Sequence, residues 1–160
     1  MTAYLPGILD RLMGESARPG AAPAARHGIE QLKDSVVREL DALLNARAGA
    51  APERFDAWPQ ARASVLNYGL ADFAAFSLAG SADRAAVCAA IKEAIERHEP
   101  RLANVSAALE AEPGAVNRLH FVIHATLRAH DGSEPVDFDA VLQPSSLHYT
   151  IGKAGRPPRG

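Results

Sequence analysis

Several residue types are scarce in this chain of 160 residues, and each scarcity narrows the possible functions. Cys88 is the only cysteine, so an internal disulfide is impossible and a reducing compartment is favoured. Aromatic residues make up 6% of the chain, and no expected strand displays two or three of them outward, which argues against nucleic-acid binding. The formal net charge of -2 gives no overall attraction to nucleic acid or to an anionic membrane.

Long apolar runs are also missing. The N-terminus lacks a basic region followed by a continuous apolar core, so we expect no signal peptide. No apolar stretch approaches the ~20 residues that a membrane-spanning helix needs, so we expect no membrane insertion. Together with the single cysteine, these absences lead us to expect a soluble, cytoplasmic protein.

Recognisable catalytic motifs are absent as well. The chain contains no nucleophile elbow, phosphate-binding loop or dinucleotide fingerprint. A glycosidase would need two carboxylates ~5–9 Å apart beside a cleft. Glu99 with Asp137 or Asp139 could be imagined as such a pair, but nothing in the sequence brings them together. We therefore expect a protein that is not an enzyme and holds no cofactor.

His120 and His124 raise the question of a metal site, because their spacing matches that of a helical zinc-binding pair. The surrounding residues alternate between apolar and polar, which predicts a strand. Four residues along a strand separate the two side chains by ~13 Å, too far for one ion. We expect no metal site.

The first 27 residues are expected to form a tethered segment outside the folded domain. Residues 4–13 place Leu9, Leu12 and Met13 on one side of a short helix, and residues 14–27 are rich in Ala, Gly and Pro, which is typical of a flexible linker. An apolar helix on a tether indicates an anchor for a partner, although packing on its own domain remains the alternative.

Two long amphipathic helices are predicted within a single domain that spans residues 28–144. The first, at residues 28–47, repeats apolar residues at helical spacing: Ile29, Leu32, Val36, Leu40, Leu43 and Leu44. The second, at residues 83–98, carries a stripe of Val87, Ile91 and Ile95, and Ser81 or Asp83 could cap its start.

The segment between these helices reads as irregular. Residues 48–63 form a loop that Phe55 and Trp58 are expected to anchor to the core. The stretch that contains Asn67 and Gly69 reads as a tight turn, because both residues tolerate a left-handed backbone.

Three strands are predicted at residues 102–109, 118–128 and 135–142. The short links between them favour an antiparallel meander that is buried on one face. The expected fold class is therefore α+β, with N-terminal helices packed on a small antiparallel sheet of three or more strands. Residues 145–160, after Pro144, are expected to form a flexible tail.

The tripeptide Glu99-Pro100-Arg101 marks the change from helices to strands. Pro100 disfavours helical geometry at Glu99 and cannot donate a ladder hydrogen bond. In an extended chain, Glu99 and Arg101 point to the same side and can form an ion pair. Such a pair contributes only ~0–1 kcal/mol when it is exposed.

Four short motifs, in one order, resemble the TssE family, baseplate subunits of the bacterial type VI secretion system. That family is related to the wedge protein of contractile-tail phage baseplates, long described as lysozyme-like. The motifs are Leu9-Asp10-Arg11-Leu12, Ser35-Val36-Val37-Arg38-Glu39-Leu40 with Leu43-Leu44-Asn45-Ala46-Arg47, Ser64-Val65-Leu66-Asn67-Tyr68-Gly69-Leu70, and Glu99-Pro100-Arg101-Leu102. Two departures are Ala71, where the family often has proline, and Ala46, where it usually has threonine.

The resemblance implies a structural baseplate subunit that connects the wedge to the contractile sheath. Such subunits are similar to the strand-exchanging domain of the sheath subunit, so this chain would template sheath polymerisation by strand addition at an open sheet edge. Its partners would be the wedge subunits TssF, TssG and TssK and the sheath subunits TssB and TssC. It would work on the cytoplasmic side, at the inner face of the cell envelope.

The resemblance also assigns Glu99, Pro100 and Arg101 to the assembly surface. We expect Arg101 to contact a carboxylate through two hydrogen bonds, in this chain or in a partner. By pattern and tether, Leu9, Leu12 and Met13 would dock on neighbouring wedge subunits. Two alternatives stay open: a peptidoglycan hydrolase, and a generic adaptor whose N-terminal helix binds an unrelated partner.

Overall fold

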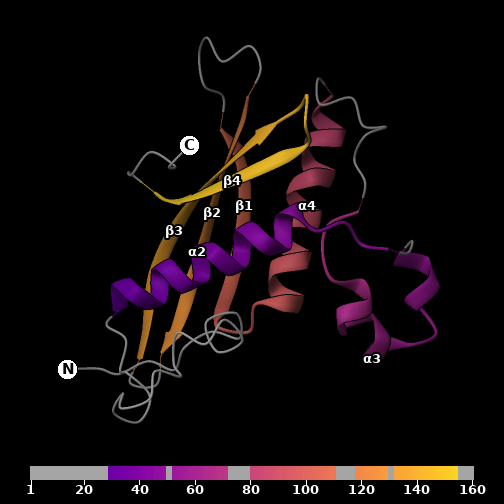
Figure 1. Ribbon diagram of the computed structural model, residues 1–160, viewed down its shortest axis with the longest axis horizontal. Coiled ribbons are helices and arrows are strands. Elements are labelled where there is room, and N and C mark those ends of the chain that lie inside the picture. Colours follow the sequence, from indigo (N-terminus) through magenta and orange to yellow (C-terminus); the bar gives the residue numbers. More distant parts are fainter. Residues whose placement is uncertain (1–28, 50–51, 72–79, 111–117, 130–131, 155–160) are drawn as a thin grey trace, which may run out of the picture.

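The computed structural model describes residues 29–49, 52–71, 80–110, 118–129 and 132–154 (Figure 1). The predicted tethered segment, with Leu9, Leu12 and Met13, lies outside the described residues. The elements, in chain order, are α2 (Ile29–Asn45), η1 (Pro52–Phe55), α3 (Pro59–Arg62), η2 (Val65–Asn67), α4 (Ser81–His98), β1 (Leu102–Glu110), β2 (Leu119–Ala129), β3 (Gly132–Gln143) and β4 (His148–Lys153).

The four strands form one antiparallel sheet in the order β1-β2-β3-β4, so each strand pairs with its neighbours in the sequence. The helices α2 and α4 pack against one face of this sheet, α4 over β1 and α2 over β4. The predicted α+β fold, with helices on a small antiparallel meander, is confirmed. In the described part of the chain, no helix combines the length and apolarity needed to cross a membrane.

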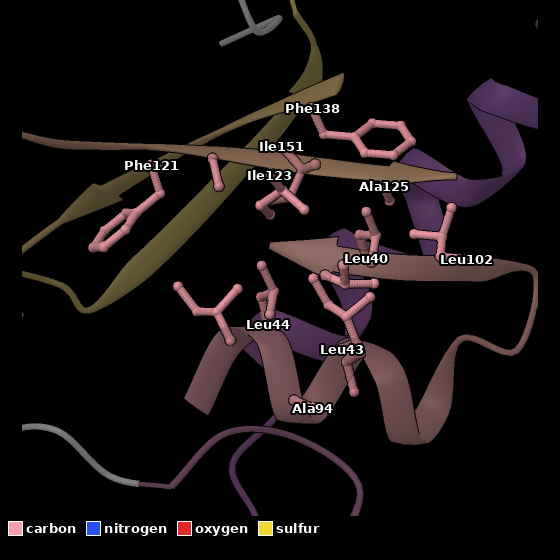
Figure 2. Close-up of a cluster of buried hydrophobic side chains, with 14 of the residues drawn as sticks. Leu40, Leu43, Leu44, Ala94, Leu102, Phe121, Ile123, Ala125, Phe138 and Ile151 are labelled. Carbon is pink, nitrogen blue, oxygen red and sulfur yellow. The ribbon is translucent and has the colours of Figure 1, made fainter. Parts of the chain in front are cut away.

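The core lies between the helix pair and the sheet. Leu40, Leu43 and Leu44 reach it from α2, and Ala94 reaches it from α4 (Figure 2). Burying one large aliphatic or aromatic side chain stabilises a fold by ~1.5–3 kcal/mol, which explains why the helical apolar stripes determine the packing. The sheet contributes, among others, Leu102, Phe121, Ile123, Ala125, Phe138 and Ile151.

The strand β2 shows how the period-two pattern positions side chains. Phe121, Ile123 and Leu127 are buried under the helices. His120 and His124, which alternate with them, lie on the face that no described helix covers. This alternation is what the sequence predicted for the strand at residues 118–128.

A β-bulge interrupts β1 near its start. Asn104 has a positive φ of 51°, and the register with β2 shifts between Ala103 and Ser106. Asparagine tolerates this left-handed conformation better than most residues do. The bulge allows Leu102 and Val105, three positions apart, both to face the core.

The prediction that residues 145–160 form a flexible tail is wrong for residues 148–153, which form β4. Tyr149 and Ile151 alternate into the core, and the strand pairs with β3 from Phe138 to Gln143. The strand is short and contains Gly152, so its pattern in the sequence is too weak to outweigh the turn residues before it. Tertiary packing makes it a strand.

Two local predictions also need correction. The prediction that Ser81 or Asp83 caps α4 is wrong, because Gly80 is the N-cap residue and offers no side chain. Phe55 is buried, as predicted, but Trp58 is 68% exposed and does not anchor the loop to the core. Trp58 lies at the start of α3, a short helix that buries none of its residues.

Candidate partner-binding site

Glu99 ends α4 and begins the turn into the sheet. Its N–H donates to the Ile95 carbonyl at 2.8 Å, while its φ of -119° and ψ of 81° leave the helical region, as Pro100 requires. Its carbonyl then accepts from the Leu102 N–H, where β1 starts. Glu99 is only 2% exposed, so its carboxylate enters the interior at the helix–strand junction.

Arg101 supplies the partner that this buried carboxylate needs. Its Nε donates to Glu99 Oε1 at 2.8 Å and its Nη2 donates to Glu99 Oε2 at 2.7 Å. The backbone N–H of Arg101 also donates to Glu99 Oε1 at 3.2 Å. The expected two-bond contact between Arg101 and a carboxylate is therefore confirmed, and it is made within the chain.

The same guanidinium binds α2. Arg101 Nη1 donates to Ser35 Oγ at 3.2 Å, and Nη2 forms an ion pair with Glu39 Oε2 at 2.8 Å. Sequence reasoning missed both contacts, although Ser35 is a hydroxyl beside the apolar stripe of α2 and Glu39 lies one turn further along. The Arg101 carbonyl accepts from the Arg128 N–H at 2.7 Å, so one residue links α4, α2 and β2.

The contacts of Arg101 with Glu99, Ser35 and Glu39, called the node below, suit a structural role better than acid catalysis. Both carboxylate oxygens of Glu99 are occupied by one guanidinium. Asp137 and Asp139, the other carboxylates considered for a glycosidase pair, bond histidines on the uncovered face of the sheet. The Arg101 side chain keeps 20% of its surface exposed, so it can still meet a partner.

The residues beside this node form a second polar contact. His98 Nε2 donates to the Asn67 carbonyl at 3.0 Å, and the His98 ring packs edge-on against Tyr68 with centroids 5.3 Å apart. Burial lowers the pKa of His98 below 6.5, against the opposing effect of the Asn67 carbonyl. Burial raises the pKa of Tyr68, with help from Glu39 and Glu99.

Gly69 lets the segment after η2 approach the end of α2. Its φ is 112°, and a Cβ there would lie 2.6 Å from the Ala46 carbonyl oxygen, so only glycine fits. That carbonyl accepts from the Leu70 N–H at 3.0 Å, and the Leu70 carbonyl accepts from the Ala48 N–H. The predicted turn is confirmed at Gly69, whereas Asn67 lies in η2 and has no positive φ.

The end of α2 also binds the outer edge of β4. The Asn45 carboxamide donates to the Tyr149 carbonyl at 2.9 Å and accepts from the Tyr149 N–H at 2.9 Å. Arg47 donates to the Leu147 carbonyl at 2.6 Å. The Asn45 side chain thus makes both bonds that a neighbouring strand would make with Tyr149.

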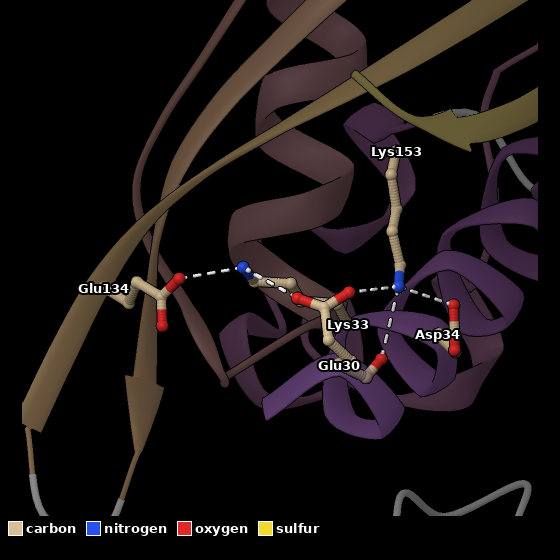
Figure 3. A network of polar contacts seen from close by, with 5 residues as sticks. All are labelled: Glu30, Lys33, Asp34, Glu134 and Lys153. Atoms are coloured by element: carbon tan, nitrogen blue, oxygen red, sulfur yellow. Dashed lines mark hydrogen bonds and ion pairs between the residues drawn. The ribbon is translucent and has the colours of Figure 1, made fainter. Parts of the chain in front are cut away.

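The start of α2 is held to the sheet by a network of charged side chains (Figure 3). Lys153 Nζ lies 2.8 Å from carboxylate oxygens of both Glu30 and Asp34. Lys33 Nζ lies 2.8 Å from Glu134 Oε1 on β3. All of these pairs retain solvent exposure, so each contributes little by itself.

The two histidines considered for metal binding are separately engaged. His120 Nε2 lies 3.2 Å from Asp139 Oδ1, and His124 Nδ1 lies 2.7 Å from Asp137 Oδ1. Within the ranges that the structure describes, no three His, Cys, Asp or Glu side chains gather closely enough to hold a metal ion.

Three of the four motifs singled out in the sequence meet in space. Ser35 and Glu39 of the second motif contact Arg101 of the last. The third motif reaches both, because Asn67 accepts from His98 beside Glu99 and Leu70 pairs with the end of α2. The first motif, with Leu9 and Leu12, lies outside the described residues, as does Met13.

Comparisons with known proteins give similarities of two kinds. A family model described as "Baseplate wedge protein gp25" matches residues 30–132, more than half of the chain. One chain of the solved structure "The baseplate complex from the type VI secretion system" is similar to this one, with a TM-score of 0.49 and 18% identity over 71% of this chain and 96% of that chain. No curated protein matches the chain.

Proposed function

The chain belongs to the baseplate wedge protein gp25 family, and from this premise we propose that it is a structural subunit of a type VI secretion baseplate. Family membership supports the baseplate role. The resemblance of the four motifs to TssE supports the secretion system as its setting. On this proposal the protein acts on the cytoplasmic side, as a component of an assembly and not as an enzyme.

The observation that carries the proposal is the node at Glu99 and Arg101. It fixes the turn between α4 and β1 by tying both to α2, and it leaves part of the Arg101 side chain exposed. A rigid junction whose Arg101 side chain stays partly exposed suits a subunit that must hold one geometry while partners assemble on it. Glu99, Pro100 and Arg101 therefore remain our proposed partner-binding residues, with Glu99 orienting the guanidinium.

We further propose that the subunit connects the wedge to the sheath. The sheet starts beside Arg101, and a sheet edge can accept a strand from another chain. The sheath partners would be TssB and TssC, and the wedge partners TssF, TssG and TssK. Leu9, Leu12 and Met13 would dock the N-terminal segment on a wedge subunit.

Co-purification tests the baseplate role. The tagged full chain, expressed with TssF, TssG and TssK of the same organism, is expected to elute with them as one complex at physiological salt. Removal of residues 1–13 should weaken that complex if Leu9, Leu12 and Met13 are its anchor. A full chain that never associates with the wedge subunits would contradict the proposal.

Sheath assembly in cells tests the role of Arg101. Arg101→Lys keeps the charge that Glu99 needs but loses the planar two-bond fork, so the monomer should stay folded while sheath assembly falls. Ile151→Val, which removes one methylene from the core at the far edge of the sheet, is the control for a modest loss of stability. Equal assembly by both variants would remove Arg101 from the partner-binding surface.

Purified protein can also be tested for wall hydrolysis. We expect no clearing of peptidoglycan in a gel assay, because the Glu99 carboxylate is fully bonded to Arg101. Clearing that disappears in Glu99→Gln would contradict the structural role.

A further inference from the structure

A groove lies at the end of β4, between the start of α2 and the first half of β3. It exists because β4 pairs with β3 only from Phe138 onward, which leaves space beside the earlier residues of β3. The groove has a volume of about 290 Å³, room for roughly ten water molecules at ~30 Å³ each, and so for a long side chain. Its lining residues are Glu30, Lys33, Pro135, Val136, Asp137, Phe138, Lys153 and Ala154.

The lining combines an apolar wall with charged groups. Val136 and Phe138 belong to the hydrophobic core, and the ring of Pro135 lies beside them in the sequence. Glu30, from the first turn of α2, and Lys153 bring opposite charges to the same space. A groove of this composition fits a side chain with an apolar stem and a charged head.

The charges around the groove do not balance. Lys33 and Lys153 form ion pairs with three carboxylates, those of Glu30, Asp34 and Glu134. Three carboxylates against two ammonium groups leave one negative charge over. Asp137 does not enter this count, because its carboxylate bonds His124 on the uncovered face of the sheet. The missing charge is that of one cation.

The network also offers an acceptor to such a cation (Figure 3). Lys33 Nζ bonds Glu134 Oε1 at 2.8 Å, and no other described residue bonds Glu134 Oε2. The Glu134 side chain is 45% exposed, so the second oxygen can be reached from solvent. A guanidinium suits this position, because its five N–H donors form a planar fork that matches a carboxylate.

We propose that the groove binds the guanidinium of Arg156, from the segment that follows Ala154 in the same chain. Ala154 is part of the lining, and its N–H donates to the Asp137 carbonyl at 3.1 Å. Arg156 comes two residues later, at most about 7 Å further along the backbone. Its methylene groups pack on Pro135, and its head group bonds Glu134 Oε2. This surface is not used by the proposed baseplate role, so either proposal can fail alone.

The position and the composition of this segment favour it over an arginine from another molecule. Residues 155–160 read Gly-Arg-Pro-Pro-Arg-Gly, with two cations and no acid. A side chain tethered at the groove has an effective concentration near the millimolar range, which a separate molecule does not reach at ordinary concentrations. Pro157 and Pro158 favour an extended chain of ~3.1 Å per residue, which places Arg159 about 9 Å beyond Arg156. Arg159 is therefore a natural control.

Proton exchange at the arginine side chains of the full chain, followed by NMR, tests the proposal without a substitution. At physiological salt, the Nε–H of Arg156 should exchange with water at least fivefold more slowly than that of Arg159. In 1 M salt the ratio should fall below twofold, because the screening length is then ~3 Å. Equal exchange of the two arginines at physiological salt would overturn the proposal.

A dilution series distinguishes the chain's own segment from a second copy. The exchange ratio should stay constant over a tenfold dilution, because the contact forms within one molecule. Slow exchange of Arg156 that disappears on dilution would assign the groove to another copy and overturn the proposal.

A matched pair of variants locates the contact from the other side. Arg156→Gln should shift the amide resonances of Val136 and Asp137 at least threefold more than Arg159→Gln does. Neither substitution touches a residue of the core or of the network, so both proteins should fold. Shifts of equal size in the two variants, or none in either, would overturn the proposal.

The acceptor is tested by Glu134→Gln, with Asp34→Asn as its control. Each variant removes one carboxylate that pairs with a lysine of the network. Glu134→Gln should bring the exchange of Arg156 to within twofold of Arg159, whereas Asp34→Asn should leave Arg156 at least threefold slower. Equal losses of protection in the two variants would overturn the contact with Glu134.

Discussion

The two edges of this sheet are built by the same kind of element, a helix over an outer strand, yet the helices bond the backbone of the two strands differently. Over β4, the helix α2 contributes Asn45, whose carboxamide takes the place of a neighbouring strand at Tyr149. Over β1, no described side chain of α4 makes such a pair of bonds to the strand, and the Cys88 thiol lies beside the Leu109 backbone. The comparison teaches that packing a helix on a strand does not by itself close the strand's edge, because closure needs donors and acceptors at the right spacing.

The contrast also depends on what fixes β1 in place. β4 is held along its length by Asn45, Arg47 and the Lys153 network. β1 is held at its start by the node at Glu99 and Arg101, and along one side by β2. An outer strand can therefore be held in place without contacts along its outer edge, provided that side chains at its end fix its position.

The largest effect is expected from removing that anchor. Arg101→Ala leaves the carboxylate of Glu99 buried without its cation, which should lower the free energy of unfolding by about 3–5 kcal/mol. Chemical denaturation measures the loss. Hydrogen exchange should rise earlier in β1 than in β4.

Glu99→Gln with Arg101→Met serves as the control, because it removes the buried pair without leaving a lone charge at Glu99. It should recover a large part of the lost stability. If Arg101→Ala costs less than about 1 kcal/mol, the node does not hold β1.

The next effect comes from removing the side chain that bonds the outer edge of β4. Asn45→Ala leaves the N–H and C=O of the buried residue Tyr149 without a partner and should cost about 2 kcal/mol. β4 should then exchange its amide protons faster and behave more like β1. Sedimentation at rising concentration should show more self-association than for the wild type, because a second edge is available.

A protein with Asn45→Ala that is as stable as the wild type, with β4 exchange unchanged, would show that α2 closes this edge by packing alone. Asp41→Ala, one turn earlier on α2, is a suitable control for the loss of a polar side chain on the same helix.

A smaller, pH-dependent effect is expected on the β1 side. Burial lowers the pKa of His98 below 6.5, so the unfolded chain binds a proton more readily than the folded chain does. The contribution of His98 to stability is therefore complete at pH values above its ordinary pKa of 6.5. It is lost as the pH falls through the folded-state pKa. Unfolding midpoints between about pH 7.5 and about pH 5 measure it.

His98→Gln keeps an N–H that can donate to the Asn67 carbonyl but cannot titrate in this range. Its stability should fall less steeply on acidification than that of the wild type. Identical pH profiles for the two proteins would mean that His98 is not the group responsible.

The smallest effect is expected at the exposed charged network around Lys153, at the end of β4. Lys153→Met removes the ion pairs with Glu30 and Asp34, which keep more than half of their side-chain surfaces exposed. The cost should be below about 1 kcal/mol and should shrink further in high salt. A larger, salt-independent loss would make this network a third anchor of β4.

The parts of the fold that the sequence predicted well are those with long, regular patterns. The α2 stripe from Leu32 to Leu44 and the alternation around Ile123 each repeat often enough to exceed the noise of single residues. The strand β4 was not predicted, because its two buried residues, Tyr149 and Ile151, are too few to form a recognisable alternation. Their burial depends on α2 and β3, which are distant in the sequence.

The candidate site shows the same division. Pro100 fixed the place of the turn, and the two-bond contact of Arg101 followed from residues two apart in an extended chain. The burial of Glu99 and the contacts with Ser35 and Glu39 could not follow from local spacing, because they depend on how α2 crosses the sheet. The same holds for Asn45, which the sequence presented only as the end of a helix.

Asn45 has a consequence for how many molecules one copy of this chain can join. A sheet with two open edges would have a valence of two, and identical copies could then chain into a fibre. One carboxamide on the last residue of α2 occupies the outward N–H and C=O groups of Tyr149 and so removes that position from one of the two edges. The Asn45 side chain thereby makes the two outer strands unequal as places where a second molecule could pair.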